Sequence, residues 1–84
     1  MKLYHICQNE NQDYDTFDSA VVCAHDEETA RNTDPCSGKQ RSKEDWASSF
    51  NSWCRSADAV TVKYLGEAAD GMQSGVICAS YNAG

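Results

Sequence analysis

The chain has 84 residues, of which 40% are hydrophobic and 24% charged, with a single proline and a net charge of −6. These values indicate one globular domain, residues 1–84, with a thin core. No apolar run approaches the ~20 residues of a bilayer-spanning helix. Nucleic acids and anionic lipids repel an acidic chain, so we expect no direct nucleic-acid binding and no membrane contact.

The first half of the chain predicts two strands followed by a short helix. Side chains in residues 2–8 alternate between the two faces of a strand, and residues 19–25 form a second strand rich in alanine and valine. Asp26 then occupies the position of a helix N-cap, before two glutamates that suit the positive end of the helix dipole. Residues 32–38 contain a proline and a glycine, which we expect to end this helix.

A second, longer helix is predicted to begin at Ser42, because Ser42 and Asp45 match a capping box. Four apolar residues then recur at helical spacing and form one stripe, namely Trp46, Phe50, Trp53 and Cys54. We expect this aromatic stripe to supply much of the core. The alternative is a recognition surface that faces solvent, since tryptophan is common at binding hot spots.

The last quarter of the chain predicts a β-hairpin. Residues 60–65 alternate between apolar and polar, residues 75–81 form a more continuously apolar run, and the segment 66–75 carries three glycines. The order strand–strand–helix–helix–strand–strand favours an α+β fold. We expect a four-stranded, mostly antiparallel sheet that two helices cover on one face.

The cysteines predict a reducing compartment. Their number is odd and their spacing is not paired, and residues 1–7 lack the long apolar region of a signal peptide. We therefore expect reduced thiols and a cytosolic protein. The five positions are Cys7, Cys23, Cys36, Cys54 and Cys78.

Possible sites for metals and catalysis have simpler explanations. His5 with Cys7, and Cys23 with His25, each share a strand face and could form a zinc set. Structural zinc ligands usually come from turns, however, and side chains on flat strands converge poorly on one ion. Residues 13–18 are rich in carboxylates but lack the central glycine and final glutamate of a calcium loop. No cysteine stands in an activating setting. We expect no metal, no cofactor and no enzymatic activity.

Two parts of the chain resemble a family. Residues 13–22 with 25–31, and residues 60–68 with 75–84, are similar to small uncharacterised proteins of tailed-bacteriophage and prophage genomes. The resemblance implies a phage origin. It implies no enzymatic activity, and it supplies no catalytic residues.

The uneven charge suggests a function. Eight carboxylates lie between residues 8 and 34, against one arginine. A compact acidic domain can occupy a basic groove that is built for a phosphate backbone. We therefore expect a phage-encoded protein that acts in the host cytoplasm. It would bind and inhibit a host nucleic-acid-handling defence component, of the anti-CRISPR or anti-restriction type. The partner-binding surface assigned to this role is Asp13, Asp15, Asp18, Asp26, Glu27 and Glu28.

Other interpretations stay open. The same carboxylates could be only a solubilising face and a helix cap. The chain could be a phage accessory protein with no role in defence. It could also sequester a small ligand such as a nucleotide signal, provided that its basic residues gather at one site. Those residues are Lys39, Arg41, Lys43 and Arg55.

Overall fold

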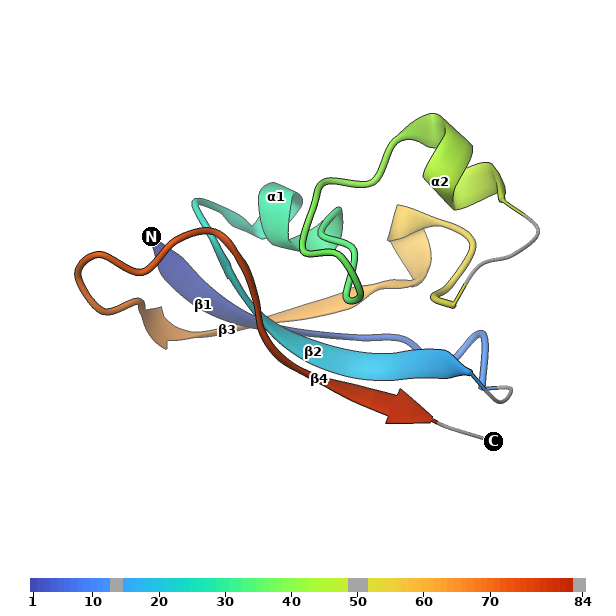
Figure 1. The fold of residues 1–84 in the computed structure, drawn as a ribbon, viewed down its shortest axis with the longest axis horizontal. Helices are drawn as coiled ribbons and strands as arrows, with labels where there is room; N and C mark the ends of the chain where they lie inside the picture. Colours follow the sequence, from blue (N-terminus) through green and yellow to red (C-terminus); the bar gives the residue numbers. More distant parts are fainter. Residues whose placement is uncertain (13–14, 49–51, 83–84) are drawn as a thin grey trace.

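The structure is a computed structural model that describes residues 1–12, 15–48 and 52–82. Within these ranges the chain forms four strands, two α-helices and one 3₁₀ turn (Figure 1). The elements are β1 (Lys2–Cys7), β2 (Thr16–Ala24), α1 (Glu27–Arg31), α2 (Lys43–Ala47), η1 (Ala57–Ala59), β3 (Thr61–Glu67) and β4 (Gly75–Asn82). The predicted α+β class, with a four-stranded antiparallel sheet and two helices, is confirmed.

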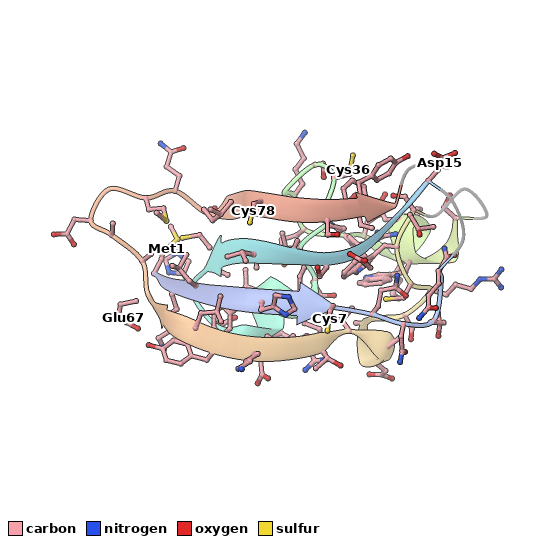
Figure 2. All side chains as sticks on the ribbon, turned by 90° about the horizontal axis from the view of Figure 1, so that it is seen from below. Met1, Cys7, Asp15, Cys36, Glu67 and Cys78 are labelled. Carbon is pink, nitrogen blue, oxygen red and sulfur yellow. The ribbon has the colours of Figure 1, made fainter. Side chains whose placement is uncertain are left out.

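The strand order of the sheet is β3-β1-β2-β4, which places the two C-terminal strands at opposite edges. The predicted hairpin of residues 60–84 is therefore wrong, although both of its strands exist. The segment 68–74 carries the chain past the ends of β1 and β2 (Figures 1 and 2). It crosses three strand spacings, about 14 Å at ~4.8 Å each. Tight hairpins use two to five connecting residues, and this longer connection permits the crossing.

One face of the sheet carries the core. The residues of β1 and β2 that point to this face alternate along each strand, as the period of a strand requires. They pack against α1 and the segment 52–60. The buried cluster consists of Tyr4, Ile6, Ala20, Val22, Ala24, Ala30, Trp53, Cys54 and Val60.

The second helix differs from the prediction. Ser42 and Asp45 form the expected capping box, but α2 ends at Ala47 and buries none of its residues. Serines are frequent after this point, and their hydroxyl groups compete for backbone hydrogen bonds. The cover on the sheet is therefore α1 and the irregular segment 52–60, rather than two packed helices.

The aromatic stripe is not one face of a helix. Trp53 lies in an irregular segment after α2 and is 0% exposed, so its predicted core position is confirmed. Trp46 is only partly buried, and the Arg41 guanidinium lies 4.5 Å from the centre of its ring. Phe50 lies outside the described residues.

No described element packs on the other face of the sheet, which Figure 2 views directly. The strand register aligns Lys63, His5, Val21 and Cys78 in one row across this face. A neighbouring row contains Thr61, Cys7, Ser19 and Ser80. These two rows hold no carboxylate.

Candidate functional site

The predicted partner-binding carboxylates lie at the two ends of β2. Asp15 and Asp18 are near its start, whereas residues 26–28 follow its last residue. The nine residues of β2 span about 27 Å at ~3.4 Å per residue. The structure thus brings the carboxylates together as two groups and not as one surface. Asp13 lies outside the described residues.

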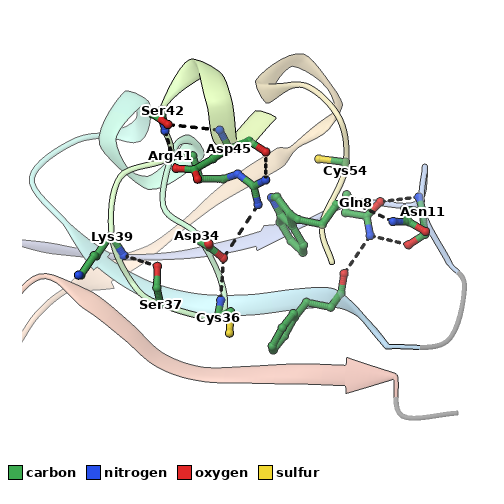
Figure 3. Close-up of polar contacts among 12 residues, drawn as sticks. Gln8, Asn11, Asp34, Cys36, Ser37, Lys39, Arg41, Ser42, Asp45 and Cys54 are labelled. Atoms are coloured by element: carbon green, nitrogen blue, oxygen red, sulfur yellow. Dashed lines mark hydrogen bonds and ion pairs between the residues drawn. The ribbon is translucent and has the colours of Figure 1, made fainter. Parts of the chain in front are cut away.

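Local hydrogen bonds position the first group, which we call the β2-start group (Asp15 and Asp18). The buried side chain of Gln8 donates to the carbonyl oxygens of Asn11, at 2.7 Å, and Phe17, at 2.9 Å (Figure 3). These bonds fix the chain on both sides of the loop. The Tyr81 hydroxyl donates to Asp15 Oδ1 at 3.1 Å. Desolvation, and then this hydrogen bond, raise the pKa of Tyr81. Both carboxylates of the group remain exposed.

The second group, which we call the α1 group (Asp26, Glu27 and Glu28), also stabilises its own helix. Asp26 Oδ1 accepts a 2.7 Å hydrogen bond from the backbone N–H of Thr29. Hydrogen bonding from the Thr29 side chain, and then from this N–H, lowers the pKa of the Asp26 carboxyl. Glu27 lies 3.7 Å from the guanidinium of Arg31, one helical turn later. All three carboxylates are exposed. These local contacts leave the three carboxylates exposed, so a partner can still reach their charge.

A groove that the sequence did not reveal lies beside the start of β4. Its volume is about 850 Å³, within the usual range of small-molecule sites. Its lining includes His25, which follows β2, the loop 36–40, and residues 74–76 at the start of β4. Lys39 and His25 are the groups in it that can carry positive charge. The described residues that line it include no carboxylate, although the chain has 13.

The loop that forms this groove is held by Asp34. The Asp34 side chain accepts from the backbone N–H of Cys36 at 2.9 Å (Figure 3). The Asp34 carbonyl oxygen accepts from Gly38 N–H at 2.8 Å. Gly38 has a φ of +76°, and a Cβ there would lie 3.3 Å from the backbone nitrogen of Val76. Glycine is therefore needed where the loop approaches β4. The sequence signal is the turn-forming segment 32–38, which by itself indicates only the end of a helix.

The four basic residues proposed for a ligand site do not gather. Lys39 lines the groove. The Arg41 side chain is only 4% exposed and lies 4.0 Å from the Asp34 carboxylate. It also donates to the carbonyl oxygen of Asp45 at 2.8 Å. Lys43 is on α2, and Arg55 is an exposed residue of the segment 52–60. Only one of the four therefore contributes to the groove.

The possible zinc ligands do not converge either. His5 and Cys7 share the uncovered face of the sheet, where Cys7 pairs with Ser19. Cys23 is four residues farther along β2, about 13 Å at ~3.3 Å per residue. His25 lies beyond the strand and lines the groove. Across the described ranges, no three His, Cys, Asp or Glu side chains form a group that could hold a metal ion.

The thiols differ strongly in access. Cys36 and Cys78 are exposed, whereas Cys23 and Cys54 are buried. Burial, and to a smaller extent the charge of Glu10, raise the pKa of Cys54 to about 11. Because the thiolate is the reactive form, Cys54 is an inert core residue.

Comparison with known proteins adds no assignment. No family model, no curated protein and no solved structure matches this chain. Of the helices in the described part of the chain, none has the length and apolar character to cross a membrane. The functional argument therefore depends on the two acidic groups and the groove.

Proposed function

We propose that this chain is a non-enzymatic, acidic interaction protein that occupies a basic protein surface built for a nucleic acid. The observation that carries the proposal is the presence of exposed carboxylates at both ends of β2. The two groups are separated by about 27 Å, the length of that strand. This length corresponds to about eight base pairs of a duplex at ~3.4 Å each. Cations that contact a duplex backbone at both ends of such a stretch lie at this spacing.

The proposed partner is a host protein rather than a nucleic acid. Complementary charge speeds association and makes it sensitive to salt, and the net charge of −6 favours a basic partner. The resemblance to phage proteins supports a nucleic-acid-handling defence component in the host cytoplasm, such as a CRISPR effector or a restriction enzyme. Binding would inhibit that component because the acidic domain takes the place of its nucleic acid.

The experiment is affinity capture from a bacterial host with matched charge variants. Asp15→Asn with Asp18→Asn removes the β2-start group, and asparagine suits the left-handed φ of 63° at Asp15. Asp58→Asn with Asp70→Asn removes the same charge from exposed positions outside both groups. The first variant should bind the captured partner more weakly and with less salt dependence, whereas the control should bind normally. Equal binding by both variants would contradict the proposal.

A second candidate function is the binding of a small phosphate-bearing ligand in the groove. The observation in its favour is that the groove combines Lys39 with hydroxyl groups and lacks a lining carboxylate. Lysine is a common phosphate ligand. In an acidic protein, an anion meets little repulsion at a surface of this composition.

Thermal denaturation with inorganic phosphate and a panel of nucleotides tests this second candidate. A ligand at a hundred times its Kd adds about 2.7 kcal/mol to the free energy of unfolding. In a domain of this size that raises Tm by roughly 10 °C or more. Lys39→Gln should abolish the shift, whereas Lys63→Gln on the sheet should preserve it. If no compound shifts Tm, or if Lys39→Gln responds like the wild type, the groove is not such a site.

A further inference from the structure

The edge strand β4 carries no charged residue over its length, Gly75–Asn82. Within the described part of the chain, its backbone makes no hydrogen bond beyond its ladder with β2. Alternate N–H and C=O groups along the strand therefore point away from the sheet without a partner. Ile77 is 48% exposed, and Cys78 and Ser80 are exposed as well.

The opposite edge, β3, carries charged residues that β4 lacks. Lys63 lies in the middle of β3 and Glu67 at its end. A bulge near Gly66 disturbs its ladder with β1. Charged residues and bulges are the usual means of preventing pairing between edge strands. β4 also has irregular positions in its ladder with β2, but it lacks charge.

We infer that β4 pairs, antiparallel, with β4 of a second copy of this chain around a twofold axis. The four strands of each copy then form one continuous sheet. In a twofold contact each strand meets an identical strand, so a charge near the middle of the strand is brought close to an identical charge and repelled. Two copies of a chain with a charge of −6 repel each other least where carboxylates are few. The residues of β4 carry none, and the Asp15 carboxylate that accepts from Tyr81 lies only at the end of the strand.

The pairing has a consequence for the groove. The middle of β4 falls between Cys78 and Ala79, so these residues lie close to the twofold axis. The start of β4, where residues 74–76 line the groove, then lies beside the end of the partner's β4. Each groove thereby gains a second wall at the interface. This inference does not depend on the proposed function.

Sedimentation equilibrium under reducing conditions tests the inference. Ser80→Glu on β4 and Thr61→Glu on β3 are matched, because both residues are exposed hydroxyl residues in the same row of the uncovered face. The wild type and Thr61→Glu should be dimers. Ser80→Glu should weaken the dimer on the order of tenfold or more, because it adds a carboxylate to each of the two paired strands close to the twofold axis. Circular dichroism establishes that both variants are folded.

A second measurement needs no variant. Amides of β4 that point away from β2 should exchange hydrogen more slowly at high protein concentration than at low concentration, while amides of β3 should not change. A monomeric wild type would overturn the inference. The unpaired edge of β4 would then be available to a β-strand peptide of another protein. A dimer that Thr61→Glu disrupts and Ser80→Glu leaves intact would overturn it too.

Discussion

Replacement of Trp53 by alanine tests the core most severely. Trp53 is 0% exposed and is the largest fully buried side chain of the described residues. Truncation of a buried tryptophan to alanine costs about 3–5 kcal/mol. An 84-residue domain has roughly 4–13 kcal/mol of total stability, at ~0.05–0.15 kcal/mol per residue. The variant should therefore be largely unfolded, or should unfold in urea at a much lower concentration than the wild type.

Trp46→Ala is the matched control. Trp46 is only partly buried, on a helix that buries no residue, and it contacts the guanidinium of Arg41. Loss of this partly desolvated cation–π contact and of limited packing should cost about 1–2 kcal/mol. Urea denaturation followed by far-ultraviolet circular dichroism measures both variants without relying on tryptophan fluorescence. The reasoning is refuted if Trp53→Ala is as stable as the wild type, or if Trp46→Ala is the more damaging change.

Three further results are expected. Gly38→Ala should lower stability more than Gly71→Ala. Both glycines have a positive φ, but only at Gly38 would the added Cβ contact a neighbouring strand. Urea midpoints measure the difference. The hydrogen bond at Asp26 lowers the pKa of its carboxyl below the ordinary value of 3.8. Its contribution to stability is therefore complete above that pH and lost below it, so acid should destabilise the wild type more than Asp26→Asn. A thiol reagent, with mass spectrometry as readout, should modify the exposed cysteines of the folded protein before the buried ones, namely Cys36 and Cys78 before Cys23 and Cys54.

Local signals in the sequence predicted local structure well. The alternation of side chains predicted the strands, and the two caps at Asp26 and Ser42 predicted where the helices begin. The pairing of the last two strands could not be predicted in this way. Which strands pair depends on contacts between residues that are far apart in the chain. Two strands that follow each other in the sequence, such as β3 and β4, need not be neighbours in the sheet.

The aromatic spacing shows a related limit. Trp46 and Trp53 fit a helical period, but the period alone cannot show that α2 ends at Ala47. Trp53 is in the core because an irregular segment places it there. Burial of a large apolar side chain was predictable, whereas the backbone that achieves it was not.

For the candidate sites too, the sequence names the residues but does not place them in space. The carboxylates could be named from the sequence, but β2 lies between the two groups and separates them in space. The groove combines His25, the loop 36–40 and residues 74–76, which are far apart in the chain. No local pattern connects them. Only the fold brings them together.

Displacement of nucleic acid from the captured partner tests the central claim most directly. A fluorescent duplex is bound to the partner, and the unlabelled acidic protein is titrated in while anisotropy is recorded. The account predicts that the duplex is released as one equivalent of protein binds, and that the variant without Asp15 and Asp18 carboxylates needs a higher concentration. A stable complex that holds the partner, the duplex and this protein together would contradict it.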